Sequence, residues 1–223
     1  ADGHNGAESL AVTPYGVVHD GVVHAARSEP PTIKLPGAMP ELWRDVVIAS
    51  TADGKLLAIG RQDGTVQVVD PGSGQELWSA ALHDGPVTSL AFSASGVRLA
   101  SGGQDRRVRV MGSSDGSVKT ELRGHTREVS GVAFSPDGSR LASSSGLLGS
   151  GDMSPGEVHV WHLATEQLSL QLRAAPDEVY CGVAWSSDGL RLFAAANPQS
   201  DADGRVEPGR IVEWSAVETE RSP

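Results

Sequence analysis

The sequence of 223 residues predicts an all-β fold built from about five four-stranded units. Three observations support this prediction: a glycine turn recurs along the chain, short apolar runs flank each turn, and no apolar run has the helical period. Strands and turns that repeat at intervals of about 40 residues are typical of the blades of a β-propeller. We therefore expect one propeller domain rather than several unrelated domains.

The recurring turn is the strongest of these signals. It reads TPYG, TADG, SASG, SPDG and SSDG, and successive turn glycines are 38, 42, 42 and 51 residues apart. The five glycines are Gly16, Gly54, Gly96, Gly138 and Gly189. A leucine stands three residues after each of the last four, as Leu57, Leu99, Leu141 and Leu192. Agreement over five copies indicates an internal repeat.

Each unit is expected to contain four strands in chain order. The first two flank the glycine turn, as VTSLAFS and VRLASGG do around Gly96, and their composition is typical of a hairpin. The third strand reads TIKLPG, TVQVVD, RVRVMG, EVHVWH and RIVEWS in the five units. A shorter fourth strand reads PELW, QELW, KTEL and SLQL in the first four units.

The repeat divides the chain into five blade units. These are 1–41, a degenerate first unit; 42–80; 81–122; 123–172, with a long loop at 146–156; and 173–223, with a long loop at 197–209. The strands are apolar on both faces, and one blade cannot bury both faces by itself. We therefore expect a ring or an obligate assembly of blades.

The residues GHTREVSGVAFSPDGSRLASSS at 124–145, followed by EVHVWH, resemble the WD-repeat (WD40-type) β-propeller family. The repeats from 42 to 172 match the family pattern well, the last repeat fairly, and the first forty residues loosely. The Trp of the family's Trp-Asp pair is present as Trp161 and Trp214. The resemblance implies a propeller that commonly serves protein–protein interaction.

Members of the family commonly stabilise each blade with a buried hydrogen-bonded network of Asp, His, Ser or Thr, and Trp. In one unit the resemblance assigns this network to His83, Ser101 and Asp105, with Met111 at the Trp position. In the next unit it assigns the network to His125, Ser143 and Trp161, without an Asp. We interpret these histidines as hydrogen-bonded structural residues rather than catalysts.

The number of units leaves the closure of the ring open. Members of the family usually close with about seven blades, whereas propellers in general have ~4 to 8. The chain is interpreted as a contiguous piece of a larger ring, as half of a composite ring completed by another copy, or as a five-bladed ring. The first two interpretations are favoured, and the sequence does not decide between them.

Long connections between second and third strands are expected on one face of the ring. They span 146–156 and 197–209, with a less distinct one near 19–31. Strands of a blade alternate in direction, so these loops emerge on the same face, which in the family usually binds partners. The resemblance implies partner contacts at Arg44, Gln62, Pro86, Gln104, Glu128 and Val179, and the loop at 197–209 adds the candidates Asp201 and Asp203. Insertions that bind nothing are the alternative interpretation.

The charge balance argues against several classes of partner. With 18 basic and 28 acidic residues the formal charge is −10, which repels nucleic acid and anionic lipid. No segment approaches the ~18 apolar residues of a membrane helix, and the single Cys181 excludes an intrachain disulfide. We expect a soluble protein, cytoplasmic rather than exported, although the sequence does not identify its compartment.

No residue pattern predicts a catalytic, cofactor or metal site. His159 and His162 are three residues apart on an expected strand, so they lie on opposite faces and cannot bind one ion together. The run Arg106, Arg107 and Arg109 is interpreted as a solvated blade surface. The sequence therefore predicts neither a nucleophile with its base nor a metal cage.

The leading hypothesis is a non-enzymatic scaffold that presents a rigid, loop-bearing face to a protein partner, as a module or subunit of a larger protein or complex. It rests on the fold. Two alternatives stay open: an enzyme, or a binder of a small molecule or metal, that uses the central channel, and a purely structural subunit of an assembly. A second chain or another copy would complete the ring in the composite interpretation.

Overall fold

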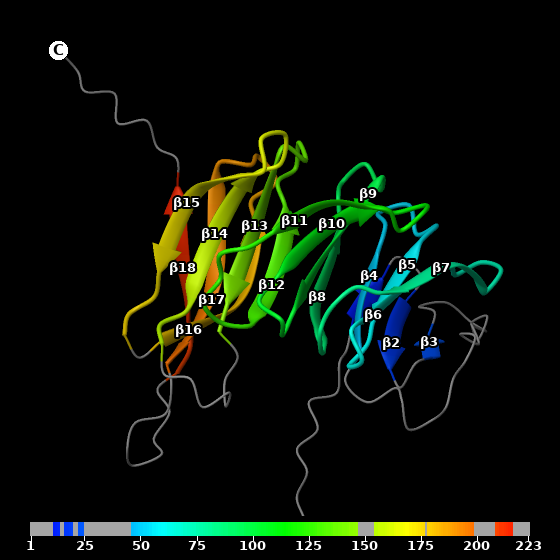
Figure 1. Cartoon of the computed structure of the whole chain (residues 1–223), viewed down its shortest axis with the longest axis horizontal. Coiled ribbons are helices and arrows are strands. Elements are labelled where there is room, and N and C mark those ends of the chain that lie inside the picture. The colour runs from blue at the N-terminus through cyan, green and yellow to red at the C-terminus, as the bar shows by residue number, and fades with distance from the viewer. Residues whose placement is uncertain are drawn as a thin grey trace, which may run out of the picture.

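The computed structural model describes residues 46–146, 154–176, 178–198 and 208–215, together with the strand assignments at 11–13, 16–19 and 22–24. These residues form five antiparallel sheets and contain no helix (Figure 1). The strands of each sheet pair in chain order, so each sheet is one local unit of the sequence. The prediction of an all-β fold with propeller-type blades is confirmed.

The strands have the following bounds. The first sheet contains β1 (Ala11–Thr13), β2 (Gly16–His19) and β3 (Val22–His24). The second contains β4 (Val47–Ser50), β5 (Leu57–Gly60), β6 (Thr65–Asp70) and β7 (Gln75–Ala81). The third contains β8 (Val87–Phe92), β9 (Arg98–Gly103), β10 (Val108–Gly112) and β11 (Val118–Leu122). The fourth contains β12 (Val129–Phe134), β13 (Arg140–Ser145), β14 (Glu157–His162) and β15 (Gln167–Arg173). The fifth contains β16 (Glu178–Trp185), β17 (Arg191–Pro198) and β18 (Arg210–Ser215).

The repeated glycine turn joins the first and second strands of a blade through local hydrogen bonds. In the fourth sheet, Ser135 Oγ donates to Asp137 at 2.6 Å and accepts from the Arg140 amide at 2.9 Å. Gly138 closes this turn with φ of 69°, a left-handed conformation that side chains other than glycine adopt at a cost. Ser186 and Asp188 repeat the arrangement in the fifth sheet. This bonding explains why the sequence reads Ser-x-Asp-Gly.

The register across the second and third strands repeats from sheet to sheet. The leucine that follows each turn is always paired with the residue at the Trp position. The pairs are Leu57↔Val69, Leu99↔Met111, Leu141↔Trp161 and Leu192↔Trp214. Equivalent residues therefore occupy equivalent places in each blade, which the sequence repeat predicts.

The sheets lie side by side as successive blades, each full sheet packed face to face on the next. Their first strands, β4, β8, β12 and β16, lie next to one another, and β1 lies beside β4 (Figure 1). The part of the chain that the structure describes forms an open arc of blades, not a closed ring.

Dry side-chain layers between neighbouring sheets form the core. One face of each full sheet presents an alanine from its second strand and two valines from its third. These trios are Ala58, Val66 and Val68; Ala100, Val108 and Val110; and Ala142, Val158 and Val160, with exposed fractions from 0% to 5%. Each packs against the leucine and the Trp-position residue of the next sheet. The small alanine leaves room for the larger neighbour.

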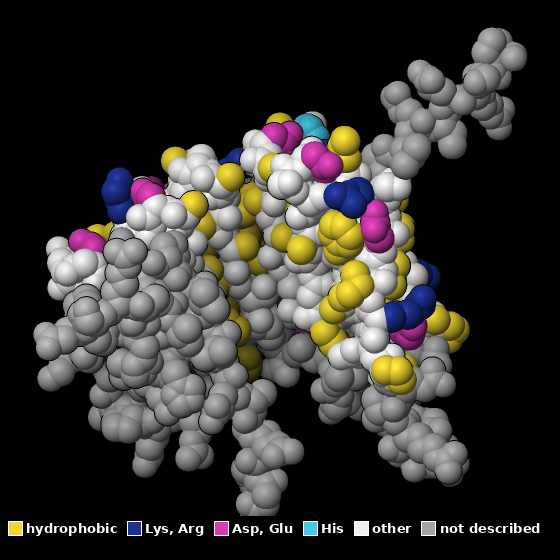
Figure 2. Space-filling model, turned by 180° about the vertical axis from the view of Figure 1, so that it is seen from behind, with side chains coloured by type: hydrophobic (Ala, Val, Ile, Leu, Met, Phe, Trp, Pro, Cys, Tyr) yellow, Lys and Arg dark blue, Asp and Glu magenta, His cyan; other side chains and the backbone are white. Residues whose placement is uncertain are grey.

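The fifth sheet differs on the equivalent face. Its register places Phe193, Ile211 and Glu213 where the other sheets have the Ala–Val–Val trio. Ile211 is 69% exposed, and Glu213 lies 3.8 Å from Arg191. Figure 2 shows hydrophobic and charged side chains interspersed on the surface at the end of the molecule that carries the fourth and fifth sheets.

None of the described residues belongs to a helix that is long and apolar enough to cross a membrane.

We expect the close approach of β12 to β9 to make Gly102 and Gly182 respond differently to alanine. A Cβ at Gly102 would overlap Val129 Cγ1, whereas a Cβ at Gly182 would meet nothing within 4 Å. Gly102→Ala should therefore lower the free energy of unfolding by about 1–3 kcal/mol, and Gly182→Ala should change it by less than about 0.5 kcal/mol. Urea denaturation measures both, and equal effects would contradict this packing of the third sheet on the fourth.

Candidate functional site

The candidate site lies at one end of the sheets, where first and third strands begin and second and fourth strands end. We refer to this as the loop-bearing end, because the connections that contain 146–156 and 197–209 leave the sheets here. The structure describes the margins of these connections, while 147–153 and 199–207 lie outside the described residues. Two buried polar clusters lie beneath this end, one in the third sheet and one in the fourth.

The cluster of the third sheet joins three elements through His83. Residue His83 precedes β8, Ser101 lies in β9, and Asp105 lies in the turn between β9 and β10. His83 Nδ1 is 2.9 Å from Asp105 Oδ1, and His83 Nε2 is 2.7 Å from Ser101 Oγ. Because a carboxylate only accepts hydrogen bonds, Nδ1 donates to Asp105 and Nε2 accepts from the Ser101 hydroxyl. Met111 occupies the Trp position and is completely buried.

Burial and hydrogen bonding set the pKa values of His83 and Asp105. It lowers the pKa of His83, whereas Asp105 acts in the opposite direction. Burial alone would raise the pKa of Asp105, but hydrogen bonds from His83 and Arg109 outweigh it and hold this pKa at about 2. The imidazole is thus neutral and the carboxylate charged near neutral pH. Such a pair holds a structure together and has no hydrogen-bonding capacity left for a substrate.

Arg109 belongs to this cluster, which corrects the interpretation of the arginine run. It is 7% exposed, and its guanidinium lies 3.0 Å from Asp105 and 2.9 Å from Glu121. Arg106, by contrast, is exposed, and Arg107 is partly buried. Alternation along β10 turns Arg109 toward the preceding sheet, and the two carboxylates compensate the buried charge.

The cluster of the fourth sheet contains a second histidine, with a different set of partners. His125 Nε2 is 2.6 Å from Ser143 Oγ, which also accepts a hydrogen bond of 2.9 Å from Trp161 Nε1. No Asp among the described residues reaches His125 Nδ1, which has no hydrogen-bond partner there. The interpretation of His125 as fully hydrogen-bonded therefore applies to one of its two ring nitrogens.

Glu157 and His159 on β14 complete this cluster. The imidazoles of His159 and His125 are stacked, with centroids 4.0 Å apart and ring planes 9° from parallel. Glu157 Oε2 lies 3.5 Å from His159 Nε2 and 3.9 Å from His125 Nδ1. Burial lowers the pKa of both histidines, that of His125 to about 3 with a further contribution from His159. Both rings are consequently neutral near pH 7.

Sequence reasoning missed this cluster. Its signal was the Glu157-x-His159 spacing, because residues two apart on a strand share a face. His125, which lacks the family's Asp, supplied a second signal. The position of His159 corresponds to that of Gln67 and Arg109 in the preceding sheets, and Arg109 Nη1 lies 2.9 Å from Nδ1 of His83, the counterpart of His125.

The candidate partner-binding residues divide into three groups. Gln62 and Gln104 are exposed, and Pro86 and Glu128 are partly buried, at the loop-bearing end. Val179 is fully buried beside Gly146 and Gly156, so its assignment as a contact residue is wrong. The candidates Arg44, Asp201 and Asp203 lie outside the described residues.

Backbone hydrogen bonds hold the loop-bearing end in place. The Gln104 amide donates to the Pro86 carbonyl at 2.9 Å, which joins the turn after β9 to the start of β8. The Gly146 amide donates to the Glu128 carbonyl at 2.9 Å in the equivalent place of the fourth sheet. These candidates therefore lie on a braced surface, as a recognition face requires.

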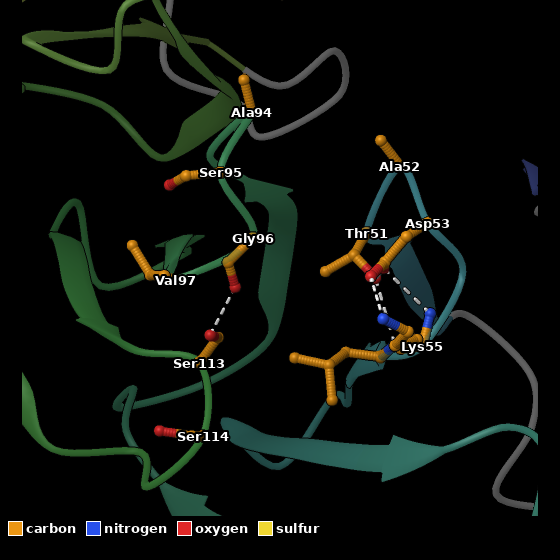
Figure 3. Close-up of a pocket in the computed structure, with 11 residues that line it drawn as sticks. Thr51, Ala52, Asp53, Lys55, Ala94, Ser95, Gly96, Val97, Ser113 and Ser114 are labelled. Atoms are coloured by element: carbon orange, nitrogen blue, oxygen red, sulfur yellow. Dashed lines mark hydrogen bonds and ion pairs between the residues drawn. The ribbon is translucent and has the colours of Figure 1, made fainter.

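The opposite end of the sheets carries a pocket of about 490 Å³ between the second and third sheets. Figure 3 shows Thr51, Asp53 and Lys55 on one side of it and Ser113, which donates to the Gly96 carbonyl, on the other. Asp53 accepts from the Thr51 hydroxyl at 2.8 Å and lies 3.2 Å from Lys55 Nζ. These polar groups satisfy one another within the glycine turns, so the pocket presents no activated nucleophile or base.

Comparisons with known proteins agree with this architecture. Residues 74–111 and 116–162 match the family model described as WD domain, G-beta repeat. No curated protein is detectably similar in sequence. Two similar solved structures are hydrazine synthase from Kuenenia stuttgartiensis, with a TM-score of 0.64 and 18% identity, and the β-propeller domain of Cps50 (Swd1) from Myceliophteria thermophila, with a TM-score of 0.59 and 21% identity.

Both structural similarities cover 76% of this chain and 50% of the other chain. The chain thus spans about half the length of these two structures. At these identities the similarity establishes the fold and not a shared activity.

Replacing Asp105 by Asn should flatten the dependence of stability on pH. Its folded pKa of about 2 lies below the ordinary value of 3.8, so the charged form stabilises the folded state above about pH 4. This contribution, about 2 kcal/mol, is lost as the pH falls from about 5 toward 2. Asp105→Asn should lack that loss, whereas Asp84→Asn, at a carboxylate 83% exposed, should keep it. Denaturant unfolding at several pH values tests the difference, and identical pH profiles for both variants would contradict it.

Proposed function

Because residues 74–111 and 116–162 are WD40 repeats within a β-propeller fold, we propose that this chain is a non-enzymatic scaffold for protein–protein interaction. Its loop-bearing end would face the partner. The observation that carries the proposal is the gathering of Gln62, Gln104, Pro86 and Glu128 at this end, above blades that internal hydrogen bonds hold rigid.

The chemistry of this end favours a partner recognised through shape and hydrogen bonds. Gln62 and Gln104 carry neutral amides that both donate and accept, and Pro86 adds an apolar surface. The overall charge of −10 disfavours nucleic acid and anionic lipid as partners. A protein surface with its own polar rim and apolar centre fits best.

We further propose that a second copy of this chain covers the free face of the fifth sheet and so contributes to a composite ring. The argument is continuity with the interfaces between blades, where three successive sheets bury an Ala–Val–Val trio under a neighbour. The fifth sheet keeps apolar residues at two of the three positions, Phe193 and Ile211, and Ile211 is exposed.

The scaffold proposal predicts that charge added at the loop-bearing end weakens partner capture. The double variant Gln62→Arg, Gln104→Arg should retain at least about tenfold less of any specific partner, because each arginine must be desolvated in the interface. The control Ser95→Arg, Ser114→Arg adds the same charge at exposed positions of the opposite end. Quantitative affinity capture with both variants and the unaltered chain measures the effect. Loss of the same proteins in both variants would contradict the choice of face.

The assembly proposal predicts a dimer in solution. Light scattering behind a sizing column should give twice the chain mass of 23.2 kDa, and Ile211→Glu should return the monomer, since a buried unpaired charge is costly. Val97→Glu places the same charge at a residue 63% exposed in a turn and should remain dimeric. A monomer at every concentration of the unaltered chain would overturn the proposal, and so would an Ile211→Glu variant that stays dimeric.

A further inference from the structure

The buried cluster of the fourth sheet places three metal-ligating side chains together. His125, Glu157 and His159 each offer one ligand atom, and these atoms lie within 4.8 Å of one another. The two histidine side chains are 1% exposed and the Glu157 side chain is 3% exposed. Neither His125 Nδ1 nor either ring nitrogen of His159 has a hydrogen-bond partner among the described residues.

Three unpartnered imidazole nitrogens in one buried cluster require an explanation. A buried polar atom without a partner costs free energy, and folded proteins seldom leave one unsatisfied. The third sheet satisfies both ring nitrogens of the corresponding His83, with Asp105 and Ser101. The fourth sheet instead places a carboxylate and a second imidazole opposite its histidine, and this donor set is typical of a transition-metal site.

We propose that His125 Nδ1, His159 Nε2 and a carboxylate oxygen of Glu157 bind a divalent transition-metal ion, for which Zn²⁺ is the best match. Two imidazoles and a carboxylate are borderline and hard donors that together suit Zn²⁺, whereas Ca²⁺ and Mg²⁺ take oxygen ligands. The Glu157 carboxylate supplies one negative charge to the ion, while Arg173, which lies 3.4 Å from the same carboxylate, is 69% exposed and remains solvated. The site joins β14 to the connection that precedes β12 and would therefore brace the loop-bearing end.

The surroundings of the three ligands orient them for this role. Ser143 Oγ is 2.6 Å from His125 Nε2 and also accepts from Trp161, which directs His125 Nδ1 toward Glu157. The second carboxylate oxygen, Glu157 Oε1, accepts from Gln171 Nε2 at 2.9 Å and lies 3.4 Å from Arg173 Nε. Hydrogen bonds of this kind to the far side of a ligand fix its orientation in metal sites.

Binding requires one imidazole to turn. A metal ion lies near the plane of each imidazole that holds it, and the two rings are stacked nearly parallel. The ring of His159 makes no hydrogen bond to the described residues, so its rotation about the Cβ–Cγ bond breaks none of theirs. Gly124 lies beside the cluster, where an added Cβ would make ordinary van der Waals contact with His159 Cε1 at 3.7 Å.

Metal titration of the purified, chelator-treated chain tests the proposal. Equilibrium dialysis with Zn²⁺ and elemental analysis should give one tightly bound ion per chain, and Co²⁺ should develop the visible absorption bands of a protein-bound ion. Added Zn²⁺ should also raise the midpoint of thermal unfolding, because it binds the folded state alone. Absence of tight stoichiometric binding, with no Co²⁺ spectrum, would overturn the proposal.

Two variants assign the ion to this cluster. His159→Gln should fold, since Gln67 stands at the corresponding position of the second sheet, and should weaken Zn²⁺ binding by about 100-fold or more. The matched control is His162→Gln, which removes an imidazole from the same strand, outside the cluster, and should bind as the unaltered chain does. Equal affinity in His159→Gln and the unaltered chain would show that the ion binds elsewhere and would overturn the proposal.

Discussion

The dry contact between neighbouring sheets is the interaction on which the rest of the molecule depends. Strands such as β9 and β10 are buried on both faces, so no single sheet of this chain is stable in water by itself. Burial of apolar surface at about 25 cal/mol per Å² drives the stacking, and the Ala–Val–Val trio gives each interface a shape that accepts a leucine and a larger side chain. Because the trio recurs, each sheet packs on its neighbour in the same way. The side-by-side arrangement of the sheets therefore results from one repeated contact.

The polar clusters occupy the place where these dry interfaces reach the loop-bearing end. There, connections between strands bring backbone and side-chain polar groups inside, and each group needs a partner. His83 meets this requirement with Ser101 and Asp105, and the pair of Arg109 with Glu121 continues the network toward the surface. The fourth sheet meets the same requirement with a different set of residues, and three imidazole nitrogens have no hydrogen-bond partner among the described residues. Two blades of similar backbone thus differ in chemistry.

The two ends of the blades have different roles for a physical reason. At one end the glycine turns are tight and their Ser, Thr and Asp side chains are engaged within the turn, so little hydrogen-bonding capacity is left for a partner. At the loop-bearing end the connections that contain 146–156 and 197–209 are longer, and Gln62 and Gln104 are exposed on short connections with a braced backbone. A rigid base with variable side chains above it is the arrangement that recognition surfaces commonly use.

The sequence by itself determined the strands, their turns and the repeat, because these depend on short-range features. The features are the turn glycine with a left-handed backbone conformation, the apolar runs on both sides of it, and the recurrence of this pattern along the chain. The network around His83 was also foreseeable, through a family pattern. Tertiary structure alone decided that Arg109 is buried, that Val179 is inaccessible, and that His125 meets Glu157 and His159. These outcomes depend on which strand lies opposite which residue, and His125 is separated from Glu157 by a whole hairpin of the chain. Local patterns carry no information about such a pairing until the sheets are stacked.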